Sequence, residues 1–343
     1  MVQASINQFC DVLSWKARFS VAPMMAWTDK HCRFFHRQIS DCALLYTEMV
    51  TAAALVHGGA IYLLDHHVQE HPVAVQLGGS DPKLLQEATK ICFDTGYSEV
   101  NLNVGCPSDR VQSGAFGAAL MKNPDGVVQC VEAMQKADGA TITVKCRIGV
   151  DEQNPYDVLP DFLSKLQSAG IRRVIIHARM AWLQGLSPKD NREIPPLNYD
   201  LVHQMKADFP EMHLSINGGL ETTQDALGHI VRGLDGAMVG RAAYHKPYDV
   251  LSKVDQMIFN QDPVCGSDLD VAEKMAPYIA HHIETGGRMH QVTRHMLGLF
   301  AGKPGARHWR RSLSELGAAN AGVAEYEILL EHVRQFQKDG LAA

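Results

Sequence analysis

The sequence predicts a (β/α)8 TIM barrel followed by a C-terminal all-helical domain. Eight short apolar runs recur over about residues 16–250, and amphipathic helical patterns alternate with them. Near-continuous apolar strands separated by helices are typical of a parallel sheet that is buried on both faces. Eight such units make a barrel of about 250 residues. The alternative is a doubly wound sheet, which is less favoured because no GxGxxG sequence opens a helix.

The predicted strands fix where the functional loops of the barrel lie. In chain order the apolar runs are Phe19–Met25, Leu44–Val50, Val73–Gly78, Val100–Gly105, Ile142–Gly149, Val174–Arg179, Leu214–Gly219 and Ala237–Arg241. Amphipathic stretches between them include Asp81–Thr95, Asn123–Ala137 and Thr222–Val231, and the first opens with an N-cap aspartate followed by proline. Ala181–Tyr199 is a long polar excursion after the sixth run, on the side where barrels carry functional loops.

The strand pattern stops after about residue 262. The segment "NQDPVCGSD" is typical of a linker, and helical patterns follow over Asp270–Glu284, Gln291–Phe300 and Glu325–Lys338. We therefore predict two domains, a catalytic barrel over residues 1–262 and a helical domain over residues 263–343.

Composition narrows the class of protein. The chain has 343 residues, of which 46% are hydrophobic and 20% charged, and a net charge of −6, so the total charge does not indicate a nucleic-acid partner, although a local patch could. No apolar run approaches the ~18 residues of a membrane span, and no basic segment followed by an apolar core opens the chain. Its eight cysteines contain no CxxC pair, which argues against structural zinc or a disulfide framework and fits a reducing cytoplasm.

Polar side chains gather at the ends of the predicted strands, where barrels carry their chemistry. Any one of them has an ordinary structural explanation, such as an ion pair or a bond to neighbouring backbone. Their convergence is what indicates a site. The strand-end residues are Pro23, Met24, Glu48, Gln76, Asn103, Cys106, Lys145, Arg147, His177, Arg179, Asn217 and Arg241.

Two adjacent glycine turns indicate a phosphate site. Asn217-Gly218-Gly219 ends the seventh strand, and Gly240-Arg241 ends the eighth. Backbone N–H groups of such turns cradle phosphate, and barrels build their phosphate site from these two loops. Glycines also form ordinary turns, but at these two positions phosphate binding is the favoured interpretation.

A single phosphate cradle without a dinucleotide fingerprint suggests a mononucleotide such as FMN. Lys145 suits the pyrimidine edge of a flavin, because a fixed cation stabilises negative charge on the reduced ring. Gln76 is able to bond the ring carbonyl and imide, and Ala22-Pro23-Met24 offers an apolar floor with backbone groups.

Two other patterns point to different chemistry and are weaker. The sequence "HVQEH" (His67–His71) matches the HxxEH metal pattern, but that pattern needs a helix and further ligands, and Pro72 with the third strand follows at once. Cys106 and His177 are a candidate nucleophile pair. No oxyanion turn accompanies them, and the phosphate cradle would then be unexplained.

The motifs, taken in order, resemble the tRNA-dihydrouridine synthases, and within them the bacterial A subfamily. The matching stretches are "APMMAWTD", "NLNVGCPSDRVQSGAFG", "VKCRIG", "IIHAR", "SINGG", "VGR" and "RHMLGLFAGKPGARHWRR", which cover nearly the whole chain. This resemblance implies an FMN enzyme that uses NADPH to reduce D-loop uridines of tRNA to 5,6-dihydrouridine. It implies no membrane and no stable protein partner.

The resemblance also implies roles for single residues. Cys106 is the implied proton donor. The implied FMN contacts are Ala22, Pro23, Met24, Gln76, Lys145, His177, Asn217, Gly218, Gly219, Gly240 and Arg241. The implied tRNA contacts are Asn103, Lys189, Arg192, Arg307 and Arg310. Two positions depart from the pattern: Met180 stands where a lysine is expected and removes a basic contact, and Ala119 stands where a cysteine is expected and changes packing.

The implied reaction explains why a strand would end in a cysteine. Hydride addition at C6 of uracil leaves negative charge on C5 and the C4 oxygen, so C5 needs a proton. A thiol with an ordinary pKa of about 8.5 is largely protonated at pH 7 and can supply it. Gly105 and Pro107 hold Cys106 in a narrow turn, and Asn103 precedes it on the same strand face.

The substrate must be turned out of the folded tRNA, at a cost of a few kcal/mol that phosphate contacts have to repay. Thr285–Arg311 is suited to this, because it holds six Lys and Arg residues and no acidic residue. A solvated helix face is the plainer interpretation of that segment. Two other functions remain open: an FMN barrel acting on free pyrimidines, as in dihydroorotate dehydrogenases, and a non-catalytic tRNA-binding module.

Overall fold

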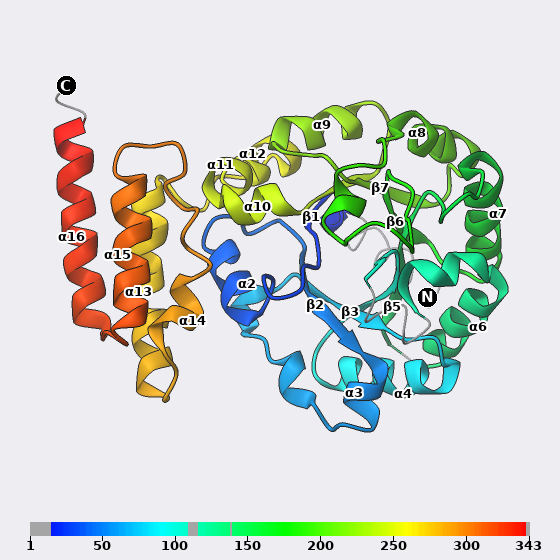
Figure 1. The fold of residues 1–343 in the computed structure, drawn as a ribbon, viewed down its shortest axis with the longest axis horizontal. Helices are drawn as coiled ribbons and strands as arrows, with labels where there is room; N and C mark the ends of the chain where they lie inside the picture. The colour runs from blue at the N-terminus through cyan, green and yellow to red at the C-terminus, as the bar shows by residue number, and fades with distance from the viewer. Residues whose placement is uncertain (1–14, 109–115, 138, 341–343) are drawn as a thin grey trace, which may run out of the picture.

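The computed structural model describes residues 15–108, 116–137 and 139–340, and within them eight parallel strands form a closed barrel (Figure 1). The strands are β1 (Phe19–Val21), β2 (Leu45–Thr51), β3 (Val73–Gly78), β4 (Glu99–Val104), β5 (Thr141–Arg147), β6 (Arg173–His177), β7 (His213–Asn217) and β8 (Gly236–Val239). They pair in the order β1-β8-β7-β6-β5-β4-β3-β2. A parallel bridge between Ser20 and Leu44 joins β1 to the β2 edge. The predicted fold class is confirmed.

Helices alternate with the strands and cover the outside of the barrel (Figure 1). They are α2 (Lys30–Arg37), α3 (Ala52–Val56), α4 (Pro82–Asp94), α6 (Pro124–Gln135), α7 (Pro155–Ser168), α8 (Tyr199–Asp208), α9 (Thr223–Val231), α10 (Arg241–His245), α11 (Pro247–Leu251) and α12 (Val254–Phe259). The predicted helix start at Asp81 is confirmed: its carboxylate accepts from the amides of Lys83 at 2.8 Å and Leu84 at 3.1 Å.

Four helices follow the barrel and stand beside it at one end of the molecule (Figure 1). They are α13 (Asp268–Glu284), α14 (Met289–Thr293), α15 (Ala306–Ala318) and α16 (Val323–Gly340). The predicted helix over Gln291–Phe300 is wrong beyond Thr293, where α14 ends and turns follow. Gly298, within this stretch, lies close to the barrel, since a Cβ there would be 2.3 Å from the carbonyl oxygen of His245.

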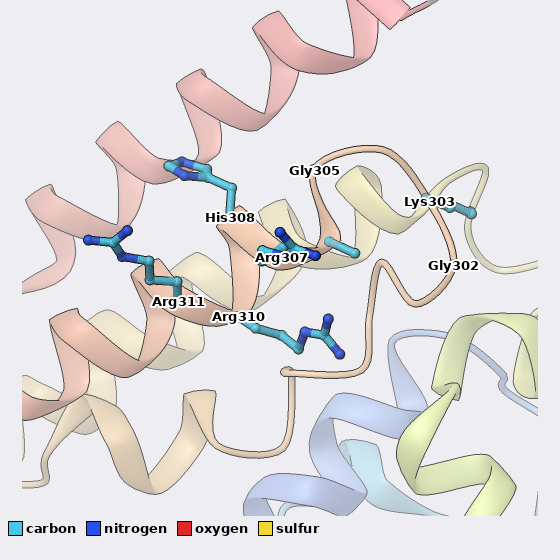
Figure 2. A pocket seen from close by; sticks show the side chains of 8 residues that line it. Gly302, Lys303, Gly305, Arg307, His308, Arg310 and Arg311 are labelled. Carbon is cyan, nitrogen blue, oxygen red and sulfur yellow. The ribbon is translucent and has the colours of Figure 1, made fainter.

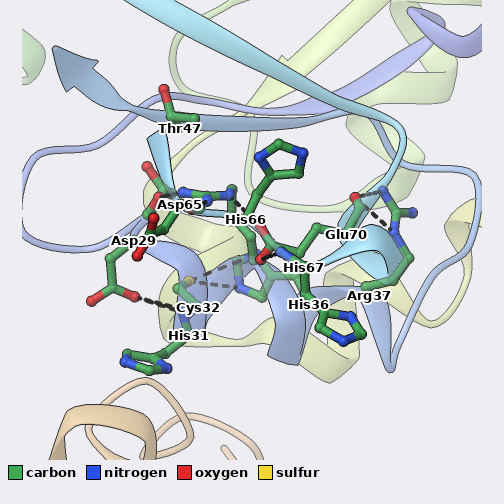
Figure 3. Close-up of polar contacts among 12 residues, drawn as sticks. Asp29, His31, Cys32, His36, Arg37, Thr47, Asp65, His66, His67 and Glu70 are labelled. Atoms are coloured by element: carbon green, nitrogen blue, oxygen red, sulfur yellow. Dashed lines mark hydrogen bonds and ion pairs between the residues drawn. The ribbon is translucent and has the colours of Figure 1, made fainter. Parts of the chain in front are cut away.

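The helical region packs against the barrel through the start of α2. The rings of Phe34 and Tyr278 stack at 3.9 Å between centroids. Asp29, which caps α2, also pairs with Arg294 and His295 beyond α14. Figure 3 shows Asp29 and His31 at this boundary. The linker is not a free tether, because Cys265 within it is buried, and the division at residue 262 stays a proposal.

The "HVQEH" stretch has an architectural explanation in the same region. It forms a short 3-10 turn, η2 (Val68–Glu70), rather than an α-helix. The buried Glu70 carboxylate accepts from Arg33 Nε at 2.7 Å and from the His67 amide at 2.6 Å. Figure 3 shows Glu70 beside His67. A buried charge needs such a partner, so Glu70 serves to anchor α2 to the turn before β3.

Across residues 15–108, 116–137 and 139–340, every helix is too short or too polar to cross a bilayer.

Candidate active site

A cavity of about 910 Å³ opens at the C-terminal ends of the strands. This size suits a small-molecule ligand, since such sites measure about 300–1,000 Å³. The structure brings most predicted site residues to its wall: Ala22, Pro23, Met24, Gln76, Asn103, Cys106, Lys145, His177, Arg192, Asn217, Gly218, Gly219, Gly240 and Arg241. Three predicted residues lie outside it. Lys189 is exposed beside the 3-10 turn η4 (Asp190–Arg192), and Arg307 and Arg310 line a different cavity.

The Cys106 turn is held from both sides. On one side, Asn103 Oδ1 accepts the amide hydrogens of Gly105 and Cys106, both at 3.0 Å. On the other, Arg147 Nε donates to the Gly105 carbonyl oxygen at 3.0 Å. The thiol itself lies 3.5 Å from Ser108 Oγ. The half-buried sulfur is therefore fixed at the cavity wall where β4 ends.

Lys145 is on β5, and its side chain lines the cavity. Its ammonium group donates to Asn217 Oδ1 at 2.9 Å, and Asn217 Nδ2 donates in turn to the Met238 carbonyl oxygen at 2.8 Å. Burial, followed by the charge of Arg147, lowers the pKa of Lys145 to about 8. Lys145 thus remains mostly charged at pH 7, and it keeps two N–H donors beyond the one bound to Asn217.

The imidazole ring of His177 is buried and lines the cavity. Its Nδ1 is buried and has no hydrogen-bond partner among the described residues. Burial, with the positive charges of Arg147 and Lys145, holds the pKa of His177 well below its usual range. The ring is therefore neutral at pH 7. Since nearly all buried polar atoms are hydrogen-bonded, this one indicates a ligand group in the cavity.

The glycine turn after β7 has no space for a side chain. Gly218 and Gly219 have φ angles of +105° and +71°, which favour glycine. Tyr199 donates from its hydroxyl to the Gly218 carbonyl oxygen at 2.8 Å. A Cβ at Gly219 would lie 2.5 Å from Leu197 Cδ1 and 2.7 Å from the Tyr199 hydroxyl.

The second glycine turn, Gly240-Arg241, follows β8 directly. The helix that follows Gly240, α10, has only five residues. Its dipole therefore adds little positive potential at this turn, and the positive charge there comes from the Arg241 side chain. Arg241 Nη1 already pairs with Glu193 Oε1 at 2.5 Å. The donors on its Nε and Nη2 make no hydrogen bond within the described chain, and they remain for an anion.

The cavity is basic, and sequence reasoning named all but one of the Lys and Arg residues that line it, missing Lys246. Among the described residues, six Lys and Arg residues line it, against two carboxylates: Lys145, Arg147, Arg179, Arg192, Arg241 and Lys246, with Glu193 and Glu221. Lys246 follows α10 rather than a strand, so the strand-end pattern did not point to it. Arg147, which bonds the Gly105 carbonyl oxygen, also donates to the carbonyl oxygens of Met180 at 3.0 Å and Asn191 at 2.8 Å, and so joins the loop after β4 to the loop after β6.

A second basic cavity, of about 660 Å³, lies at the start of α15 (Figure 2). Its lining is Gly302, Lys303, Gly305, Ala306, Arg307, His308, Arg310 and Arg311. Lys303 pairs with Asp268, and Arg311 Nε with Glu315 at 2.7 Å. Arg307 and Arg310 are exposed, and their guanidinium groups form no ion pair or hydrogen bond with described residues, so their charges are available to an external anion.

Comparison with known proteins agrees with the geometry. The family model described as dihydrouridine synthase (Dus) matches residues 20–337. The chain is 50% identical over 329 residues to the tRNA-dihydrouridine(20/20a) synthase of Shewanella oneidensis, covering 96% of this chain and 97% of that protein. It is 50% identical over 327 residues to the protein of the same name from Escherichia coli K12, covering 95% and 93%. For Pasteurella multocida the identity is 51% over 322 residues, covering 93% and 97%. The chain belongs to the dihydrouridine synthase family.

Proposed function

We propose that this enzyme reduces the C5=C6 bond of uridine at positions 20 and 20a of tRNA, with FMN as its cofactor and NADPH as the reductant. The observation that carries the proposal is the 910 Å³ cavity, which gathers Cys106, Lys145, His177 and both glycine turns around one space. Relatives that match over nearly their full length are named tRNA-dihydrouridine(20/20a) synthases, which supports the substrate and the positions but names no cofactor. The substrate and the reductant both belong to the cytoplasm, where we propose that the enzyme works.

The residues present fit FMN. The unpartnered Nδ1 of His177 offers a ligand contact, and Gly218 and Gly219 present backbone without a side chain to the cavity that they line. Arg241 would hold the phosphate with its remaining donors, while Lys145 and Gln76 would hold the polar edge of the ring system. When bound, FMN supplies a hydride to the substrate.

Cys106 would then protonate C5 of the uracil. The thiol stands on the cavity wall in a turn fixed by Asn103 and Arg147, so its proton meets the substrate from one defined direction. Asn103 Nδ2 donates one of its hydrogens to Gln76 Oε1, and its second hydrogen is available to the uracil base. Lys145 and Arg147 favour negative charge that develops on the uracil carbonyl oxygen, since both cations line the same cavity.

We propose that residues 263–343 form the tRNA-binding domain. The support is the cavity at the start of α15, in which Arg307 and Arg310 have no acidic partner among the described residues. Phosphate contacts of this kind repay the cost of turning a base out of its stack. Lys189 and Arg192, on the loop after β6, would contact the tRNA from the barrel side.

An FMN barrel that acts on free pyrimidines is the second candidate. The deep cavity with its glycine turns suits that function equally well, but the second basic cavity would have no use. The two functions separate in one assay, in which the purified, flavin-loaded protein and NADPH are given either unmodified tRNA or free uracil or orotate. We expect NADPH consumption with tRNA alone. Turnover of free pyrimidine without turnover of tRNA would refute the proposal, and absence of bound flavin would refute its cofactor.

Two substitutions in the cradle are expected to release FMN. Gly219→Val adds a side chain whose Cβ would lie only 2.5 Å from Leu197 Cδ1, so the turn has to shift. Arg241→Ala removes a charge-assisted contact worth about 1.5–3 kcal/mol, or roughly a ten- to hundredfold weaker FMN affinity. Flavin retained after gel filtration, measured by absorbance, reports both effects.

Gly233→Val is the matched control for the glycine variant. Gly233 also has a positive φ, +106°, but a Cβ there meets nothing within 4 Å, so backbone strain is tested without the clash. Gly233→Val should keep its flavin. Full FMN occupancy in both Gly219→Val and Arg241→Ala would mean that the phosphate binds elsewhere.

A further inference from the structure

The inside of the barrel below the cavity is polar along one line. Glu99, Asn101 and Asn103 alternate on β4 and are all buried, while Gln76 on β3 and Thr143 on β5 stand beside them in register. Barrel interiors are usually filled by bulky apolar side chains. A buried polar row in that position therefore calls for an explanation.

These five side chains form one continuous chain of hydrogen bonds, which we call the β4 chain. It starts at the Cys106 turn, where Asn103 Oδ1 accepts the amides of Gly105 and Cys106. Asn103 Nδ2 donates to Gln76 Oε1 at 2.8 Å, and Gln76 Nε2 donates to Asn101 Oδ1 at 2.8 Å. Asn101 Nδ2 then donates to Thr143 Oγ1 at 2.9 Å.

The far end of the β4 chain is a carboxylate. Thr143 Oγ1 donates to Glu99 Oε1 at 2.9 Å. That oxygen also accepts from the Tyr46 hydroxyl at 2.7 Å, and Arg173 pairs with it. Glu99 and Arg173 are both buried, so this ion pair is a fixed anchor.

Both ends of the chain have a fixed polarity. The carboxylate paired with Arg173 only accepts, and a backbone N–H only donates. Thr143 must therefore donate to Glu99 and can accept only from an amide nitrogen, which orients Asn101. The same constraint passes to Gln76 and then to Asn103, where the two backbone amides require an oxygen. No amide in the chain can turn over without leaving a buried polar atom unpaired.

We propose that Thr143 and Asn101, anchored by Glu99, are positioning residues for the active site. They act through the β4 chain, which fixes the amide orientations of Gln76 and Asn103 and the seat of the Cys106 turn. The inference rests on the proposed function, because Gln76 and Asn103 are its cofactor and substrate contacts.

The fixed orientation decides what the cavity offers to a ligand. The Gln76 amide uses one N–H donor and one oxygen lone pair in hydrogen bonds within the β4 chain. One N–H and one lone pair of the same amide remain available to a ligand in the cavity that it lines. A group with a neighbouring carbonyl and imide matches that pair. Thr143 itself is fully buried and does not line the cavity, so any effect of its hydroxyl on the site has to pass through the β4 chain.

Thr143→Val tests the chain, because it removes the hydroxyl link at nearly constant volume. Thr143→Ser restores the hydroxyl. Thr89→Val is the matched control: Thr89 is equally buried, and its hydroxyl bonds the Leu85 carbonyl oxygen at 2.7 Å, away from the β4 chain. If Thr143→Val does not fold, Thr143→Ala removes the same link without adding a methyl group to a buried site.

Two measurements on each variant separate positioning from general stability. The first is FMN affinity of the flavin-free protein, from quenching of FMN fluorescence. The second is the rate at which iodoacetamide labels Cys106 across a pH series, read from the Cys106 peptide by mass spectrometry. For Thr143→Val we expect FMN affinity to fall and Cys106 labelling to rise, each by about 2- to 30-fold. Thr143→Ser should stay near wild type, as should Thr89→Val.

The outcomes also separate this inference from the proposed function. If Thr143→Val matches Thr89→Val in both measurements, the β4 chain is a structural feature only and the inference is wrong. If the wild-type protein does not bind FMN, the proposed function fails, while the labelling of Cys106 still decides whether Thr143 holds the turn.

Discussion

Replacing Cys106 by alanine is expected to lower the rate of dihydrouridine formation in tRNA by roughly 10²–10⁴-fold, the usual contribution of general acid catalysis. The variant should still bind FMN and should still allow NADPH to reduce it, because the thiol belongs to the uridine step alone. Single-turnover mixing of the NADPH-reduced variant with tRNA, followed by flavin absorbance, measures the loss.

Cys42→Ala is the control for that experiment. Cys42 is the other cysteine in the described chain that is only partly buried, and it does not line the cavity. Its removal should leave the reaction unchanged. If Cys106→Ala reduces tRNA at the wild-type rate, Cys106 is not the proton donor and the role assigned to its turn is wrong.

The second large effect is expected for Arg307→Ala combined with Arg310→Ala. Log affinity for tRNA should fall linearly with log salt in the wild type, with a slope set by the phosphates that are neutralised. The double variant should flatten that slope by about one to two units. Reduction of FMN by NADPH should be unaffected, because neither arginine lines the barrel cavity. Tests at several salt concentrations are needed, since long-range repulsion from a chain of net charge −6 is screened beyond about 8 Å.

A charge-neutral pair in the same helix provides the comparison. Arg311 Nε already pairs with Glu315 at 2.7 Å, so Arg311→Gln with Glu315→Gln removes both charges and changes the net charge by nothing. That variant should keep nearly the wild-type slope. An unchanged slope and affinity in the Arg307 and Arg310 variant would show that this cluster is a solvated helix face and that tRNA binds elsewhere.

Much of the barrel could be predicted from sequence, because buried parallel strands leave long apolar runs. The helical region was harder. Helix α15 (Ala306–Ala318) was not predicted, and only Trp309 and Leu313 of its residues are buried. Two apolar residues one turn apart give a weak periodic signal among arginines. The opposite error occurred at Gln291–Phe300, where buried Met296 and Leu299 have helical spacing but lie in turns.

Contacts within the site were likewise predictable where they join strand ends and not where they join loops. Residues at strand ends, such as Gln76, Lys145 and Asn217, could be predicted to meet because closing the barrel brings all strand ends to one rim. Contacts made by loops could not. The pairing of Arg241 with Glu193 joins residues 48 positions apart, and nothing in the local sequence of either one specifies it. The β4 chain was also hidden, because the alternation in "EVNLNV" would suggest a strand with one solvated face.

The central claim is that this barrel and its helical region act together on a uridine in tRNA. The most direct test incubates the purified FMN-loaded protein with NADPH and an unmodified tRNA transcript, and then maps dihydrouridine by nuclease digestion and mass spectrometry. The account predicts dihydrouridine at positions 20 and 20a, and none when Cys106→Ala replaces the wild type over the same time. A transcript that stays unmodified in the presence of loaded enzyme and excess NADPH would contradict it.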